Sequence, residues 1–300
     1  MSFCSDAKLE ILETRSRQRT LKKALAHGLF LFARSFGDQQ ILLRSELPEI
    51  PALAARLLSG RDFLGKQAIL RQSDSISAKR AVYSLALPNP ADRHALLALF
   101  GGNADRIARE LLTTPEECAA FLAGMFLSCG NVSDPERSYH LEFAVRSSML
   151  CKDLLALLTE VIPGARATTR RTKPLIYYKE CVQIEDFLTL SGASKASLAM
   201  IDVEMLKTVR NHANRATNCE TANIDKQVEA AAVQLRAIQK LAATPGLLQT
   251  LPEPLQLMAA LRLQHPDASL RELAELAGTS RSGAHRRLAA LVQLSISPDK

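Results

Sequence analysis

Apolar stretches with a central glycine occur twice in the N-terminal part of the chain, and the same patterns follow each of them. The segments "AHGLFLFARSFGDQQILLRSE" and "LAGMFLSCGNVSDPERSYHLE" both place apolar residues at helical spacing around Gly28 or Gly124. A polar turn and a strand-like stretch come next in both. Each segment therefore predicts a helix that leads through a turn into a strand.

The patterns that follow also correspond. Leucine-rich amphipathic stretches, "PALAARLLSG" and "CKDLLALLTEVIPG", predict one helix in each half. Basic two-strand patterns and a short helix that ends in "FGG" or "LSG" complete each half, and Gly101 and Gly192 are spaced much as Gly28 and Gly124 are. The sequence predicts an α+β domain over residues 1–205, in which an αββαββα unit occurs at 1–105 and again at 112–205.

Composition and charge narrow the class of protein. A chain of 300 residues with 47% hydrophobic content can bury a sizeable core, and its net charge of +7 favours a polyanionic partner. The six cysteines form no C-x-x-C pair, so neither a zinc site nor a disulfide framework is indicated, and we expect no cofactor. Because no segment reads as a signal peptide or membrane span, we expect a soluble, cytoplasmic protein without a membrane partner.

Two copies of an αββαββα unit that opens with a glycine-containing helix resemble the LAGLIDADG homing endonucleases. The resemblance implies closely packed helices, a saddle of strands on DNA, and an acidic residue at each helix end that holds Mg²⁺. Here the metal-ligand positions fall on Cys129 and Ala33, and the other acidic position of the second motif falls on Leu127. A thiol is a poor ligand for a hard cation. Asp38 and Asp134 lie further on and are expected to be turn residues.

From residue 208 onward the composition changes to alanine and long side chains without a strand pattern, which predicts a helical connection over 206–246, in one or two helices. Asn211, Asn214 and Asn218 lie at i, i+3 and i+7 on one face, with Arg215 beside them. This face is interpreted either as a solvated surface or as a contact for DNA phosphates, with Asn214, Arg215 and Asn218 as the candidates.

Residues 247–300 predict an all-α domain with a helix-turn-helix. The second of its helices opens with the capping-box pair Ser269 and Glu272 and ends at Gly278, and a third helix follows Ser280. The third helix contains no acidic residue, which is typical of a helix that lies in a DNA groove. The residues expected to contact DNA are Ser280, Arg281, Ser282, His285, Arg286 and Arg287, the last of them through a phosphate. A basic protein-interaction module is the alternative.

Two further strings, "GNVSDPERSYHLEF" and "NRATNCETANIDK", closely resemble segments of the WhiA family of bacterial transcription regulators. That resemblance implies a degenerate LAGLIDADG domain joined to a helix-turn-helix, no catalysis, and control of sporulation or cell-division genes. Double-stranded DNA is then the expected partner, with a nucleoid location and no small-molecule substrate. An active LAGLIDADG-type endonuclease and a scaffold that binds another transcription regulator are the alternatives.

The segment "RATTRRTKPLIYYK" carries basic residues without an acid among them, and a basic segment occupies the corresponding place in the first half. If the strands form a saddle, these charges are expected to lie on its concave face and contact the DNA backbone. The candidates are Arg166, Arg170, Arg171, Lys173 and Lys179, with Lys66, Arg71, Lys79 and Arg80 in the first half. A solubilising hairpin is the alternative.

Overall fold

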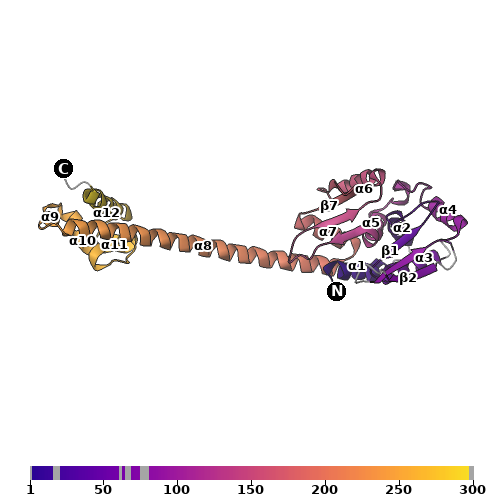
Figure 1. Cartoon of the computed structure of the whole chain (residues 1–300), viewed down its shortest axis with the longest axis horizontal. Helices are drawn as coiled ribbons and strands as arrows, with labels where there is room; N and C mark the ends of the chain where they lie inside the picture. Colours follow the sequence, from indigo (N-terminus) through magenta and orange to yellow (C-terminus); the bar gives the residue numbers. More distant parts are fainter. Residues whose placement is uncertain (1, 16–20, 61–62, 65–68, 75–80, 297–300) are drawn as a thin grey trace. The chain divides into compact units, whose positions relative to one another are not determined.

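The computed structural model describes residues 2–15, 21–60, 63–64, 69–74 and 81–296, with the backbone alone at 69–74. The chain forms two compact units, Met1–Lys207 and Thr208–Lys300 (Figure 1). Within the described residues, no helix combines the length and the apolar composition that crossing a bilayer requires.

The first repeat follows an N-terminal helix and contains a three-stranded antiparallel sheet of order β1-β3-β2. In chain order its elements are α1 (Phe3–Arg15), α2 (Lys22–Leu31), β1 (Leu42–Ser45), α3 (Glu49–Leu58), β2 (Ile69–Asp74), β3 (Ala81–Ala86) and α4 (Pro90–Leu99). A single bridge between Ser35 and Leu42 takes the place of the first predicted strand. Among the described residues, this repeat is therefore one regular strand short of αββαββα.

The second repeat has the complete order of elements. It contains α5 (Pro115–Cys129), β4 (Gly130–Val132), β5 (Leu141–Ala144), α6 (Ser148–Val161), β6 (Arg166–Arg170), β7 (Lys173–Tyr178) and α7 (Cys181–Ser191), after a short 3-10 turn at Arg109–Leu111. Its sheet has the order β4-β5-β7-β6. Gly101 and Gly192, with φ of 87° and 100°, follow the ends of α4 and α7, Gly192 directly and Gly101 after Phe100. The predicted α+β class is confirmed, and the predicted αββαββα order is complete in the second repeat.

Helices α2 and α5 are the centre of this unit, and glycine lets them approach closely. A Cβ atom on Gly28 would lie 2.0 Å from the carbonyl oxygen of Phe121, and one on Gly124 would lie 2.1 Å from that of Leu25. Each glycine thus accommodates the backbone of the partner helix. Residues Ala119–Leu127 of α5 are all buried, because α5 is covered on every side.

His27 lies in the same interface and is fully buried. Its ring stacks on Phe100 with a centroid distance of 5.1 Å and lies 4.9 Å from Phe121. Neither ring nitrogen has a hydrogen-bond partner among the described residues. Burial, with a smaller contribution from Lys23, lowers the pKa of His27 to about 3, so the ring is neutral near pH 7.

The predicted helical connection is part of one long helix. Helix α8 runs without a break from Ser194 to Ala242, and so begins inside the segment assigned to the N-terminal domain. Its first turns are held there because Ala196 and Met200 are buried in the core of the N-terminal unit. From Thr208 to Ala230 every residue of α8 is exposed. The change of composition comes only at residue 208, after the first turns of α8 have packed on the core, so the sequence did not predict where the helix begins.

The C-terminal unit adds α9 (Leu247–Thr250), α10 (Glu253–Gln264), α11 (Leu270–Leu276) and α12 (Arg281–Ile296). Its core combines Ile238 and Leu241 of α8 with residues from the last three helices. Those residues are Met258, Ala259, Leu273, Ala274, Ala284, Leu288 and Leu291. The three helices expected from the apolar pattern are present, and so is the capping box between Ser269 and Glu272.

Candidate nucleic-acid interface

Helix α12 is positioned by the turn that precedes it. Gly278 takes a left-handed conformation with φ of 56°, which lets the chain reverse directly after α11. The Ser280 hydroxyl then accepts a hydrogen bond from the Gly283 amide at 3.1 Å and caps the first turn of α12. Ala284, Leu288 and Leu291 are buried, so they fix which face of α12 points away from the core.

The exposed face of α12 carries the predicted DNA-contact residues. Ser280, Arg281, Ser282, His285 and Arg286 are exposed, while Arg287 is half-buried at the flank. Within the described residues, none of these three arginines forms an ion pair. Guanidinium, imidazole and hydroxyl groups at the start of a helix can reach base edges and phosphates in a major groove. The arrangement suits a recognition helix.

Arg262 is a residue that the sequence interpretation missed. It is 2% exposed, and its Nη1 donates to the carbonyl oxygen of Ala268 at 2.6 Å and to that of Pro266 at 3.3 Å. These bonds hold the loop between α10 and α11. Burial lowers the pKa of the Arg262 guanidinium. Its position four residues after the buried Met258 was the available signal, because that spacing places it on the apolar stripe of α10.

The basic hairpin of the second repeat is formed by β6 and β7, and all of β6 is exposed. Register pairs Arg170 with Lys173 and Arg166 with Tyr177, which places these four residues on one face of the sheet. The opposite face packs on the core through Ile176 and Tyr178. Arg166, Arg170 and Lys173 therefore lie together on the face that the helices leave open.

The tip of this hairpin has unusual backbone geometry. Arg171 and Thr172 form its two-residue turn with φ of 48° and 71°. Such a turn favours asparagine and glycine, and a β-branched residue with positive φ is strained. The chain thus places an arginine and a threonine where glycine would fit better, which is the kind of local strain that persists at functional positions.

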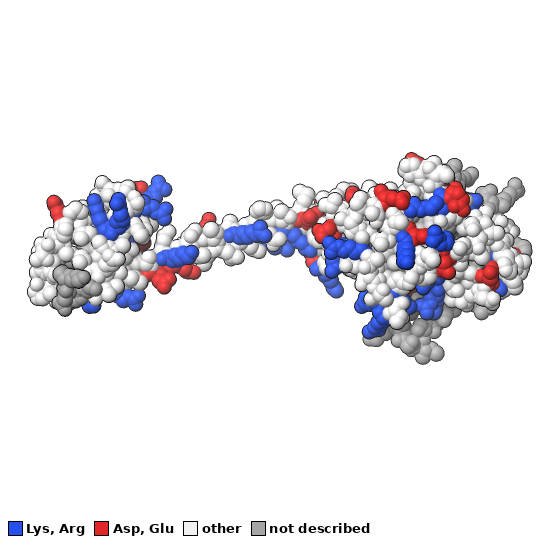
Figure 2. Space-filling model, turned by 90° about the horizontal axis from the view of Figure 1, so that it is seen from above, with Lys and Arg blue, Asp and Glu red and all other residues white. Residues whose placement is uncertain are grey.

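The open face of the sheet also holds an acidic residue, Glu142 of β5, which register places beside Tyr177. Its carboxylate lies 3.3 Å from Nε2 of His140 and accepts a hydrogen bond from the side-chain amide of Asn131 at 3.5 Å. The Lys179 ammonium lies 5.4 Å from the centre of the Tyr177 ring. Figure 2 shows basic and acidic side chains intermixed over the N-terminal unit.

The first-half counterpart of the hairpin can be followed only in part. Lys66, Lys79 and Arg80 lie outside the described residues, and for Arg71 only the backbone in β2 is described. Of the predicted phosphate contacts on α8, Asn214, Arg215 and Asn218 are all exposed. They lie in the part of α8 that no other described element covers.

Ala33 and Cys129 occupy the two positions at which the sequence comparison expected metal ligands. Ala33 is 3% exposed and offers only a methyl group. Cys129 offers a thiol, and burial raises its pKa to about 12, against a smaller opposing effect of Lys8. The thiol is therefore protonated near neutral pH. Neither position can supply the charged oxygen ligand that Mg²⁺ requires.

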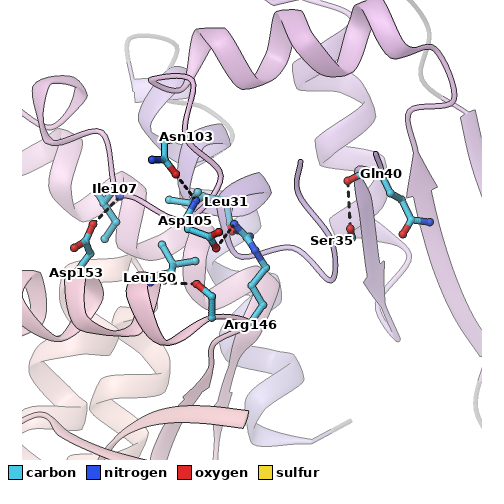
Figure 3. A network of polar contacts seen from close by, with 10 residues as sticks. Leu31, Ser35, Gln40, Asn103, Asp105, Ile107, Arg146, Leu150 and Asp153 are labelled. Atoms are coloured by element: carbon cyan, nitrogen blue, oxygen red, sulfur yellow. Dashed lines mark hydrogen bonds and ion pairs between the residues drawn. The ribbon is translucent and has the colours of Figure 1, made fainter. Parts of the chain in front are cut away.

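Basic side chains occupy the same ends. The Lys8 ammonium group donates to the carbonyl oxygen of Leu127 at 3.3 Å, and Arg146 donates to that of Leu31. Leu31 and Leu127 each lie three residues after the central glycine of their helix, so the two carbonyls are equivalent. Figure 3 shows Arg146 between Leu31 and Asp105, whose carboxylate is 3.6 Å from Nη2. Both contacts place a cationic group at the C-terminal end of a helix, where the helix dipole is negative, and are therefore favourable.

The two aspartates of the turns are also engaged elsewhere. Asp134 accepts a hydrogen bond from the Glu136 amide at 3.0 Å, as expected of a turn residue. The Asp38 carboxylate lies 3.3 Å from the ring of His94. The group in the described residues that could hold a metal ion is Cys181, Glu185 and Glu204. The Cys181 thiol donates a hydrogen bond to the Glu185 carboxylate at 3.0 Å, and this bond explains why the two side chains are close without a metal ion.

Comparisons with known proteins cover both units. The model of the WhiA LAGLIDADG-like domain matches residues 118–210, and that of the WhiA C-terminal HTH domain matches residues 213–295. The "Probable cell division protein WhiA" of Halothermothrix orenii is 32% identical over 96% of this chain and 96% of its own length. The protein of the same name from Desulfitobacterium hafniense is 42% identical over 59% of this chain and 56% of its own.

A solved structure shares the fold. The crystal structure of full-length DUF199/WhiA from Thermotoga maritima covers 99% of this chain and 98% of its own, with a TM-score of 0.59 and 20% sequence identity. At that identity the likeness concerns the fold, which includes the N-terminal repeats and the C-terminal helices.

Proposed function

This chain belongs to the WhiA family, and we propose that it is a sequence-specific DNA-binding transcription regulator without catalytic activity. The observation that carries the proposal is the exposed, acid-free start of α12, which follows a tight turn and presents Arg281, Ser282 and His285. The relatives are named cell division proteins. We therefore place the target genes in cell division or sporulation and expect the protein at the nucleoid.

The test is recovery and sequencing of DNA fragments that co-purify with the intact protein, followed by binding measurements on the enriched site. We expect a shared sequence motif and a binding preference over scrambled DNA. Specific sites are generally bound about 10³-fold or more tightly than non-specific DNA at physiological salt. Equal affinity for enriched and scrambled fragments would contradict sequence readout.

Absence of catalysis has its own experiment. Supercoiled plasmid that carries the enriched site is incubated with the protein and Mg²⁺ or Mn²⁺, and we expect no nicking at concentrations that saturate binding. The reason is chemical, because Ala33 and the protonated Cys129 leave both helix ends without a carboxylate. Site-dependent nicking that disappears in Asp38→Asn or Asp134→Asn would restore the endonuclease alternative.

The open face of the second sheet is proposed as a second contact with the DNA backbone. Arg166, Arg170 and Lys173 share that face, and the strained turn adds Arg171. Each phosphate contact steepens the salt dependence, with log K falling by about 0.9 for each tenfold rise in salt. Contacts from Asn214, Arg215 and Asn218 of α8 would add to the same dependence.

The measurement compares two double variants of the full chain on one operator. Arg170→Gln with Lys173→Gln should reduce the salt slope by roughly 0.9 for each phosphate that the variant no longer neutralises. Arg56→Gln with Lys152→Gln removes the same charge from exposed positions on α3 and α6, and should leave the slope near that of the wild type. Equal slopes in both variants would favour the scaffold alternative, in which this unit binds another regulator.

A further inference from the structure

The C-terminal unit contains a cavity of about 380 Å³ beside the start of α12. Its wall is formed by α8, by the end of α10, by the loop between α10 and α11, and by the first residues of α11 and α12. The polar side chains that matter most are Lys226, Gln227, Gln234, Arg262, Ser269 and Arg281. Arg281 thus belongs both to this cavity and to the proposed recognition face.

The charge in the cavity is unbalanced. Lys226, Arg262 and Arg281 are cationic, and no acidic residue lines the wall. Arg262 is 2% exposed, its Nε has no hydrogen-bond partner, and no carboxylate among the described residues lies within ion-pair distance of it. The carboxylate of Glu272, which follows closely in the chain, accepts from the Ser269 amide at 2.7 Å instead. A buried guanidinium without a counter-ion is unfavourable, and an anion in the cavity would remove that penalty.

The side-chain oxygen of Gln234 is a second buried atom without a hydrogen-bond partner in the described part of the chain, and it indicates that the ligand also carries a hydrogen-bond donor. Gln234 is 9% exposed, and its Oε1 is a buried acceptor without a donor in the described residues. A fully deprotonated anion satisfies Arg262 but offers no donor to Gln234, whereas a molecule with N–H or O–H groups as well as a phosphate can satisfy both. The volume lies within the range of small-molecule sites. Leu270 and Ala230 add an apolar surface for a ring.

We propose that this cavity binds a nucleoside phosphate, with the phosphate between Lys226, Arg262 and Arg281 and the donor groups of the nucleoside toward Gln234. Because Arg281 belongs to both the cavity and the proposed DNA-contact face, we expect the bound ligand to compete with DNA for its guanidinium and to weaken operator binding. This part of the proposal rests on the proposed function of α12. The other source of a phosphate at this place is the DNA backbone itself, and the experiment separates the two.

Binding is measured by calorimetry on the full-length protein, with pyrophosphate and with a panel of adenosine and guanosine mono-, di- and triphosphates as probes. We expect saturable binding of at least one nucleotide. Lys226→Gln should weaken it about tenfold or more, which corresponds to the loss of a hydrogen bond to a charged group. Arg286→Gln removes an exposed arginine of α12 that does not line the cavity, and should leave nucleotide affinity unchanged.

Gln234→Leu distinguishes the two ends of the ligand. It should weaken nucleotide binding and leave pyrophosphate binding unchanged, because only the nucleoside meets Gln234. A saturating nucleotide should weaken operator binding about fivefold or more in the wild type, a coupling of ordinary size, and much less in Lys226→Gln. These results together would support the proposal.

Two outcomes would overturn it. If no probe binds at millimolar concentration while Lys226→Gln lowers the salt slope of operator binding, the cavity holds a DNA phosphate and not a small molecule. If no probe binds and the slope is unchanged, the cavity contains only water. In both cases operator binding by the wild type still tests the proposed DNA-binding function separately. If the wild type bound nucleotide but no operator, only the DNA-binding function would be refuted.

Discussion

Replacing Gly124 by alanine tests whether close approach of α2 and α5 determines the stability of the N-terminal unit. The new Cβ would lie 2.1 Å from the Leu25 carbonyl oxygen and 2.8 Å from the Leu29 amide nitrogen, and both atoms belong to backbone. Real Cβ atoms essentially never come closer than 3.0 Å to another atom, so the helices would have to separate by about 0.9 Å. No side-chain rotation can relieve this contact.

The magnitude follows from two opposing effects. Alanine is favoured over glycine inside a helix by about 1 kcal/mol. Overpacking of a core usually lowers stability by about 1–3 kcal/mol, and a gap of 0.5–1 Å forfeits roughly a quarter to a half of each dispersion contact along the seam. Since α2 and α5 are buried along most of their length, the cost is expected near the upper end of this range, which leaves a net loss of about 2 kcal/mol.

The distribution of tyrosine provides a selective assay. The chain contains four tyrosines and no tryptophan. All four, at positions 83, 139, 177 and 178, belong to the N-terminal unit, so tyrosine fluorescence during urea unfolding reports that unit alone. Gly37→Ala is the matched control, because a Cβ there meets nothing within 4 Å. If Gly124→Ala unfolded at the same urea concentration as the wild type and this control, the close-packing argument would be refuted.

Three further outcomes are expected. Arg281→Ala and His285→Ala should each weaken operator binding by about 1–3 kcal/mol and spare non-specific binding, whereas Arg287→Ala should weaken all sequences alike in titrations with cognate and scrambled DNA. The pKa of His27 is lowered, so the contribution of its neutral ring to the free energy of unfolding is complete above the unfolded pKa of 6.5 and is lost as the pH falls toward 3. Between pH 7.5 and pH 5, the free energy of unfolding of His27→Phe, measured with urea, should therefore rise by about 2 kcal/mol relative to that of the wild type. Thr172→Gly should raise stability by about 1 kcal/mol in the same assay, and no gain would argue against strain in the turn.

Local patterns were sufficient to predict most of the fold. Apolar spacing around Gly28 and Gly124 predicted the paired helices, and the Ser269–Glu272 pair predicted where α11 begins. The start of α8 at Ser194 was not predictable in this way, because the change of composition that signals the helix comes only after its first turns have packed on the core. The local pattern also predicted a regular strand near Ser35, where the described residues form a single bridge to Leu42.

The candidate site was predictable to the extent that it lies on one element. The face of α12 follows from the period of its apolar residues, and the sequence therefore identified its exposed members. The cavity beside Arg281 joins residues of α8, α10 and α12, and no spacing along the chain brings Lys226 and Arg262 together. A buried arginine on an apolar stripe was the only local indication of it.

The ends of α2 and α5 differ from a metal site in more than the residues at Ala33 and Cys129, because each end also has a cationic side chain on a backbone carbonyl. Lys8 comes from α1, and Arg146 comes from the segment after β5, yet they reach equivalent carbonyls at Leu127 and Leu31. A guanidinium at such an end repels a divalent cation, while it stabilises the negative end of the helix dipole. An aspartate in place of Cys129 would lie within the electrostatic reach of Lys8, which would compete with a metal ion for the new carboxylate. The two contacts hold backbone carbonyls at the ends of α2 and α5, so among the described residues they support the packing of the helix pair.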